Sequence, residues 1–264
     1  MQKKSFHIGG SIEEATQGKV DLQATPIIRE AFLLTNKTLV AFVPAVLCYV
    51  LVQLVLVGGF VEVKTGNALS QLTELVAGGE LTSELMHTLM IGGQFADVLS
   101  APLFLALSLM AVNHSVGLPT RIKQIMGVIP NLMLMSVLVM MFILALQASA
   151  ATLFFPLGLF MTMALGNTLL LASDKRLPLL KAVQVSVVAT VRHLGPITLV
   201  YGVIMALFFM SVMSFGIGLI WALPFYFNAK AVIYRTLFGL TLKVASEASE
   251  TDTPNNAKTV VFDA

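Results

Sequence analysis

The chain has 264 residues, of which 57% are hydrophobic and only 11% are charged, and its formal net charge is +2. A soluble domain carries about 25% charged residues, so this sequence has too little polar surface to cover a water-soluble core. The composition predicts an all-α, polytopic membrane protein, and the small net charge argues against nucleic-acid binding. Cys48 is the single cysteine, which excludes an internal disulfide.

Three regions are expected along the chain. Residues 1–24 are polar and lack the apolar core of a cleavable signal peptide, so we expect a disordered cytoplasmic N-terminus. Residues 25–240 form the membrane domain, whose first span serves as the insertion signal. Residues 241–264 are polar again and are expected to be a disordered cytoplasmic tail.

Six apolar runs are long enough to cross the bilayer, since a helix needs about 20 apolar residues to cross roughly 30 Å of hydrocarbon. Leucines at helical spacing in the long loop 63–93 predict two short helices that rest on the outer face. The sequences QASAA (147–151) and SFGIG (214–218) predict tight turns. The predicted spans are about 38–61, 95–114, 128–146, 152–172, 197–215 and 218–234.

The positions of Lys and Arg predict the orientation. With both termini cytoplasmic, the inner segments hold every basic residue of the chain except Lys64 and Lys230. Lys64 falls in the outer loop together with four glutamates, and Lys230 falls inside the sixth span. This asymmetry is typical of a bacterial inner-membrane protein with both ends inside.

Three inner segments combine a proline at a helix start with a basic residue about one turn later, a pattern typical of amphipathic elbow helices on the cytoplasmic surface. We expect basic side chains of these elbows to contact lipid headgroups, namely Arg29, Lys123, Lys181 and Arg192. In the last elbow, Ala182, Ser186 and Thr190 form a stripe of small residues that permits close packing against another helix.

The three returning spans share a further pattern. Each contains a proline that is followed, eleven residues later, by a polar residue on nearly the same helical face. These pairs are Pro102 with Asn113, Pro156 with Asn167, and Pro224 with Arg235. The pattern suggests a pseudo-threefold hairpin repeat about the membrane normal, although prolines and polar span ends can also recur by chance.

Polar residues in the inner halves of spans two, four and six allow two interpretations. They could line a cavity open to the cytoplasm that attracts an anionic headgroup, or they could form hydrogen bonds between helices, each worth about 0.6 kcal/mol. We favour the second interpretation. The residues are Asn113, His114, Asn167, Asn228, Lys230 and Arg235.

Lys230 is the most unusual of these residues, because an ionisable group inside a span suggests function by default. Its long stem could also carry the ammonium group to the inner headgroups, and we favour this snorkelling. Asp97 is expected to lie at the start of a helix near the outer interface, several ångström from Lys230 in depth.

Signatures of catalysis are missing from the sequence, which contains no HExxH, CxxC, GxSxG or Walker motif. The four histidines fall in four different segments, so no metal cluster is suggested. We therefore expect neither an enzyme nor a bound cofactor.

The order of elements resembles that of the YciC-like family of bacterial six-span inner-membrane proteins. The similarity covers about residues 25–240 and lies in the long outer loop, the charged turn LLLASDKR, Gly195-Pro196, and the final Tyr234-Arg235. The resemblance implies a multi-pass inner-membrane protein without an established activity. Related domains precede a soluble glycerophosphodiesterase in some proteins, and that chemistry does not carry over to this chain.

The leading functional hypothesis is a non-enzymatic membrane scaffold or envelope-maintenance factor. Its expected partners are membrane lipids and other inner-membrane proteins or a second copy of itself. The alternative is a small-solute or lipid transporter, or a channel, with a polar cavity that faces the cytoplasm.

Overall fold

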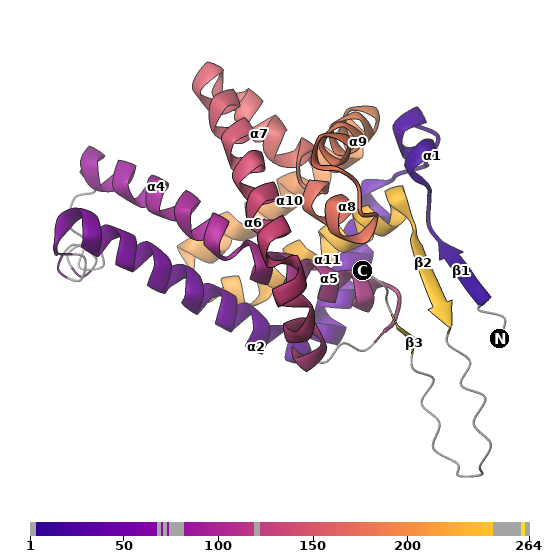
Figure 1. Cartoon of the computed structure of the whole chain (residues 1–264), viewed down its shortest axis with the longest axis horizontal. Helices are drawn as coiled ribbons and strands as arrows, with labels where there is room; N and C mark the ends of the chain where they lie inside the picture. Colours follow the sequence, from indigo (N-terminus) through magenta and orange to yellow (C-terminus); the bar gives the residue numbers. More distant parts are fainter. Residues whose placement is uncertain are drawn as a thin grey trace, which may run out of the picture.

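The computed structural model describes residues 4–67, 70, 73, 82–118, 122–244 and 260–261. These residues form a mostly helical fold with one small sheet (Figure 1). The elements are β1 (Lys4–Ile8), α1 (Ile12–Gln17), α2 (Ala24–Thr65), α4 (Ser83–Leu99), α5 (Ala101–Ser115), α6 (Ile122–Leu153), α7 (Phe155–Ala164), α8 (Thr168–Asp174), α9 (Leu179–Arg192), α10 (Leu194–Met213), α11 (Leu219–Phe238), β2 (Leu240–Val244) and β3 (Val260–Val261).

Several of these helices are long and apolar enough to cross a membrane. Within the described part of the chain, four helices meet this criterion, and the bent pair α4–α5 brings the number to five if it counts as one span. The four are α2, the apolar part of α6 (Leu132–Leu153), the α7–α8 segment (Phe155–Asp174) and α10. The structure therefore defines an all-α membrane protein with several spans.

Helix α2 is one continuous helix of 42 residues, so the expected division into an elbow and a span at residues 37–38 is wrong. Lys37 and its polar neighbours do not interrupt the backbone, because polar side chains on a helix surface leave its hydrogen bonds intact. At about 1.5 Å per residue, such a helix is roughly twice as long as the hydrocarbon is thick. Pro44 lies inside it.

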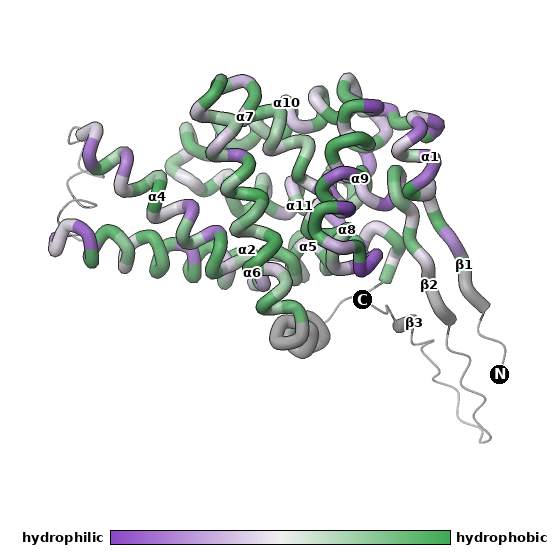
Figure 2. The backbone as a smooth tube through the Cα atoms, turned by 45° about the horizontal axis from the view of Figure 1, so that its top comes forward, coloured by the Kyte–Doolittle hydropathy of each residue, from purple (hydrophilic) through white to green (hydrophobic). Residues whose placement is uncertain are grey.

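The far half of α2 and helix α4 form an arm that extends away from the other helices, as Figures 1 and 2 both show. Val57, Val61, Leu85 and Leu89 pack between the two helices as a small apolar cluster, separate from the main core. The second outer-face helix was therefore predicted wrongly, because Leu85 and Leu89 belong to α4 and pack against α2. The first such helix, around Leu69–Val76, falls mostly outside the described residues.

The predicted second span is interrupted. Helix α4 ends at Leu99, helix α5 begins at Ala101, and the two helices are bent by 63°. Pro102 lies in the first turn of α5 and has no N–H to offer the preceding turn, which explains why the helix breaks at this position.

Helix α6 continues through QASAA, so the turn predicted at 147–151 is wrong. Alanine and glutamine favour the helix, and the chain turns only at the extended Phe154, just before Pro156 starts α7. Gly158 then lies against Ala151, where a Cβ on the glycine would come within 2.7 Å of the alanine Cβ. The predicted SFGIG turn between α10 and α11 is confirmed.

The N-terminal segment was expected to be disordered but forms β1 and α1. Strand β1 pairs with β2 in antiparallel register, with Phe6 opposite Leu242, and β3 pairs with the other edge of β2. The chain passes so close to the end of α11 that a Cβ on Gly9 would overlap the carbonyl of Arg235, so only glycine fits there. The rest of the C-terminal tail lies outside the described residues.

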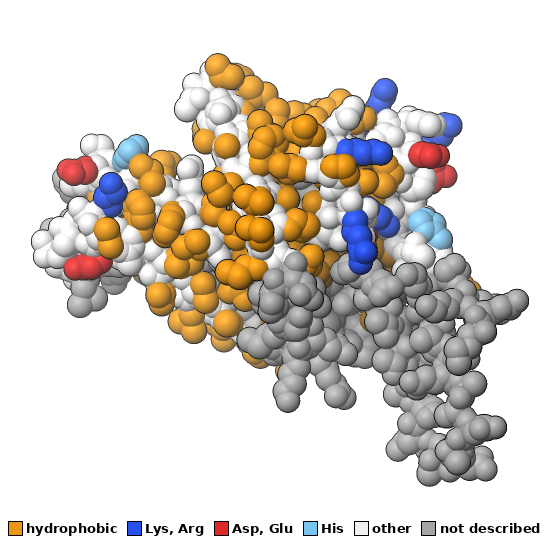
Figure 3. Space-filling model, in the orientation of Figure 1, with side chains coloured by type: hydrophobic (Ala, Val, Ile, Leu, Met, Phe, Trp, Pro, Cys, Tyr) orange, Lys and Arg blue, Asp and Glu red, His pale blue; other side chains and the backbone are white. Residues whose placement is uncertain are grey.

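Helix α11 forms the centre of the bundle, where it packs against α2, α5 and α10. From Phe227 to Tyr234 every residue of α11 is buried. In the face that Figure 3 presents, hydrophobic side chains cover the middle, and the charged side chains gather at the two ends. The basic groups lie mostly at the end that holds α1 and α9.

The three prolines of the proposed repeat do not occupy equivalent positions in their helices. Pro102 and Pro156 each start a helix, whereas Pro224 lies inside α11.

Candidate functional site

The six residues of the predicted polar cavity lie at three different places in the bundle. Asn228, Lys230 and Arg235 are on α11, Asn113 and His114 are in the last turn of α5, and Asn167 immediately precedes α8.

Arg235 connects three helices at the C-terminal end of α11. Its Nη2 donates to both carboxylate oxygens of Glu30 on α2, each at 2.8 Å, and its Nη1 donates to the carbonyl of Ser115 on α5. Two hydrogen bonds to one carboxylate fix both the distance and the orientation of the guanidinium relative to that carboxylate. The Arg235 guanidinium is therefore engaged by other groups of the protein, and we name this arrangement of Arg235, Glu30 and Ser115 the Arg235 clasp.

Two further hydrogen bonds join α11 to α2. Asn228 is fully buried and donates from Nδ2 to Thr35 Oγ1 at 3.1 Å, and the Trp221 indole donates to Asn36 Oδ1 at 3.0 Å. These contacts correspond to the interhelix interpretation of the polar residues.

Other polar atoms near the bundle core have no partner among the described residues. Asn113 Oδ1, His114 Nδ1 and Asn228 Oδ1 are buried without a hydrogen bond. The His114 ring lies edge-on to Phe42, with 5.4 Å between ring centres. Asn167 is buried at the start of α8 but does not cap the helix with its side chain.

Lys230 is 4% exposed, so the predicted snorkelling is wrong. Its Nζ lies 4.7 Å from the centre of the Phe104 ring and 5.2 Å from that of Tyr226, one turn earlier on α11. The side chain thus points away from Tyr234 and Arg235 and into the bundle. Among the described residues, its ammonium group has neither a hydrogen bond nor an ion pair.

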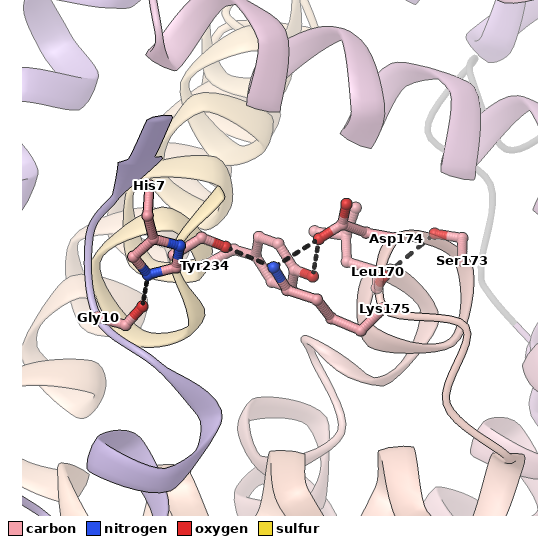
Figure 4. Close-up of polar contacts among 8 residues, drawn as sticks. His7, Gly10, Leu170, Ser173, Asp174, Lys175 and Tyr234 are labelled. Atoms are coloured by element: carbon pink, nitrogen blue, oxygen red, sulfur yellow. Dashed lines mark hydrogen bonds and ion pairs between the residues drawn. The ribbon is translucent and has the colours of Figure 1, made fainter. Parts of the chain in front are cut away.

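A second polar cluster lies where α8, the end of α11 and β1 meet, as Figure 4 shows. The Tyr234 hydroxyl donates to Asp174 Oδ2 at 2.6 Å, and Lys175 Nζ contacts the same oxygen at 3.4 Å. Lys175 also donates to the carbonyl of Gly239 at 2.8 Å, and His7 bonds to Gly10 beside it. The charges of Asp174 and Lys175 balance each other, so this cluster stabilises the packing at the end of the bundle.

The residues expected to contact lipid headgroups fall into two groups. Arg29, Lys181 and Arg192 are exposed, and Arg29 borders a shallow groove of about 450 Å³ on α2. The side chain of Lys123 lies outside the described residues. The small-residue stripe of α9 packs closely on α7, where Ser186 donates to the carbonyl of Ala164 at 2.6 Å.

Sequence reasoning missed a polar centre at the α4–α5 bend. Gln53 Nε2 lies 2.8 Å from Tyr49 Oη, 2.8 Å from Asp97 Oδ1 and 3.1 Å from Ser100 Oγ. The expectation that Asp97 starts a helix is wrong, because it lies in the last turn of α4. Tyr49 and Gln53, four residues apart inside an otherwise apolar run, were the signal in the sequence. We name Tyr49, Gln53, Asp97 and Ser100 the bend cluster.

Within the described part of the chain, no group of three His, Cys, Asp or Glu residues could hold a metal ion. Comparison of the chain with protein-family models, with curated proteins and with solved structures gives no match.

Proposed function

We propose that this protein is a non-enzymatic membrane scaffold or envelope-maintenance factor, and that it acts through membrane partners that bind the α2–α4 arm. In this proposal α11 is the sixth span and both termini are cytoplasmic. The membrane is the bacterial inner membrane, in keeping with the YciC-like layout of the sequence. Helix α9 acts as a cytoplasmic elbow.

The observation that carries the proposal is the arm itself. It extends beyond the other helices, and its outer surface is apolar, with Val55 72% exposed and Met90 61% exposed. A Cβ added to Gly59 or Gly93 would meet nothing within 4 Å, so bare backbone is open to a neighbour. Small residues let membrane helices approach closely, and close packing rather than hydrophobicity drives their association.

Photo-crosslinking in living cells tests the proposal. A photoreactive residue is placed at Val55 or Met90 of the arm, and at Phe209 or Val212 of α10 as controls with comparable exposure. We expect discrete protein adducts from the arm and only lipid adducts from α10. Lipid adducts alone from all four positions would contradict the proposal.

A matched pair of glycine variants connects the arm to function. Gly59→Leu and Gly202→Leu both place a side chain into open space on an apolar helix, so neither should disturb the fold. In a strain that lacks the gene, we expect Gly202→Leu to restore the envelope phenotype and Gly59→Leu to fail. A deletion strain with unchanged envelope lipids, protein complexes and stress responses would contradict the proposed role.

A transporter is the second candidate, and the α4–α5 bend favours it, because interrupted membrane helices often form substrate sites. Its predicted cavity has less support, since Arg235 and Asn228 are engaged with other helices. Solute or lipid flux into proteoliposomes that contain only this protein would favour the transporter over the scaffold.

A further inference from the structure

The bend cluster brings oxygen atoms together at an interruption of a membrane helix. The Tyr49 hydroxyl, the Asp97 carboxylate and the Ser100 hydroxyl all lie within about 3 Å of one atom, Gln53 Nε2, and are therefore close to one another. The residues come from α2, α4 and the junction between α4 and α5. Such a convergence from separate segments is a property of a binding site.

The charge of Asp97 is not balanced by a neighbouring cation. Among the described residues, its carboxylate accepts one hydrogen bond, from the neutral amide of Gln53, and has no ion pair. Glu30 and Asp174, in contrast, each contact a basic side chain. Asp97 also lies at the C-terminal end of α4, which carries no basic residue in its last turn. The helix dipole there adds negative potential, so the position favours a positive charge.

Helix α11 borders this region with two further groups. The centre of the Tyr226 ring lies 6.3 Å from that of Phe104, and the centre of the Phe104 ring lies 6.3 Å from that of Tyr49 in the cluster. The Lys230 ammonium lies against the Phe104 and Tyr226 rings and makes no ion pair with Asp97. The titratable groups of the cluster are therefore Tyr49 and Asp97, and those next to it, across the Phe104 ring, are Tyr226 and Lys230.

The ligand set selects the class of ion. Carboxylate and hydroxyl oxygens suit a hard cation, and one carboxylate supplies too little charge to hold Mg²⁺ or Ca²⁺ against their hydration. Interrupted membrane helices use such positions, with freed carbonyls and a helix C-terminus, to hold Na⁺ or H⁺. We propose that the α4–α5 bend is a binding site for one monovalent cation, sodium or a proton, with Asp97 as its charged ligand.

Occupancy of this site has a mechanical consequence. Helix α4 belongs to the arm and α5 to the bundle, so an ion held by Asp97, Ser100 and Tyr49 connects the two parts at their joint. Binding of the ion stabilises one angle of the bend. This inference does not depend on the scaffold role, because it concerns a site that either candidate function could use.

The test is thermal unfolding of the full chain in nanodiscs, with NaCl compared with choline chloride at equal ionic strength, and with each salt measured from pH 5 to 8. Asp97→Asn keeps the size of the side chain and removes its charge. Glu84→Gln is the matched control, because it removes an exposed acid from the other end of the same helix. Tyr49→Phe removes one neutral oxygen and keeps Asp97.

At sodium concentrations about tenfold above the dissociation constant, we expect the wild-type unfolding midpoint to rise by about 3 °C. Glu84→Gln keeps the response, Tyr49→Phe weakens it, and Asp97→Asn loses it. A response to acid but not to sodium, again lost in Asp97→Asn, identifies the cation as a proton. If Asp97→Asn does not fold, the comparison of Tyr49→Phe with wild type decides. Equal responses to sodium and to pH in wild type and in the folded cluster variants would overturn the proposal.

Discussion

The two basic residues of α11, Lys230 and Arg235, are only five positions apart but have opposite surroundings. Arg235 belongs to the Arg235 clasp, where it donates hydrogen bonds to Glu30 and to a backbone carbonyl. Lys230 is buried among aromatic rings without an ion pair among the described residues. A charged side chain that has a partner on another helix holds the two helices together. A buried ionisable group without a partner lowers the stability of the fold and therefore indicates a function.

The largest effect on stability is expected from removing the arginine of the clasp. Arg235→Ala leaves Glu30 and the Ser115 carbonyl without their donor, and we expect the free energy of unfolding to fall by about 2 kcal/mol. The value is moderate because the Glu30 side chain is 40% exposed. Reversible unfolding in bicelles measures it, with the exposed Arg29→Ala as the control. Equal losses in the two variants would show that the clasp contributes nothing specific.

Removing Lys230, which has no ion pair among the described residues, should raise the free energy of unfolding. Lys230→Met keeps an unbranched chain against Phe104 and Tyr226 and removes a buried amine, so we expect a gain of about 1 kcal/mol in unfolding free energy. The same unfolding assay checks it, with the exposed Lys181→Met as the control. A loss comparable to that of Arg235→Ala would mean that Lys230 has a structural role.

The hydrogen bond between Tyr234 and Asp174 tests the contribution of a neutral donor. Tyr234→Phe removes the hydrogen bond to Asp174 while Lys175 remains beside the carboxylate, and we expect a loss of about 1 kcal/mol. Tyr201→Phe is the matched control, since that hydroxyl has no hydrogen bond among the described residues. Midpoints of thermal unfolding that differ by less than the experimental error would contradict the contact.

The smallest expected effect is the coupling between Asn228 and Thr35. A double-mutant cycle with Asn228→Leu and Thr35→Val should give an interaction energy of about 0.6 kcal/mol, typical of hydrogen bonds between membrane helices. Equilibrium unfolding of the four proteins measures it. A coupling near zero would remove Asn228 from the structural contacts.

The membrane class and most helices of this fold follow from the sequence, because long apolar runs bounded by charges have few other structures available. The helices α9, α10 and α11 lie close to their predicted bounds. The boundaries at QASAA and at Lys37 were wrong, because neither sequence interrupts helical hydrogen bonding. The strand β1 was missed because its partner β2 is more than 230 residues away, and the sequence contains no local signal for that pairing.

The candidate site was less predictable for a related reason. The sequence indicated that Lys230 and Arg235 are unusual, but the partners that distinguish them come from other helices. Glu30 reaches Arg235 across 205 positions, and Gln53 reaches Asp97 across 44. Only the packing of α2 against α4 and α11 determines which buried charge has a partner on another helix.

The most direct test of this contrast is hydrogen–deuterium exchange of the full chain in nanodiscs, in sodium and in choline at equal ionic strength. Backbone exchange reports local opening of individual segments. We expect sodium to slow exchange in peptides that contain Gln53 and residues 96–104, with no change at the Arg235 clasp around Glu30 and Arg235. Mild acid should produce the same local protection if the ion is a proton. A change at the clasp, or an equal change along the whole chain, would contradict the assignment of separate roles to the two regions.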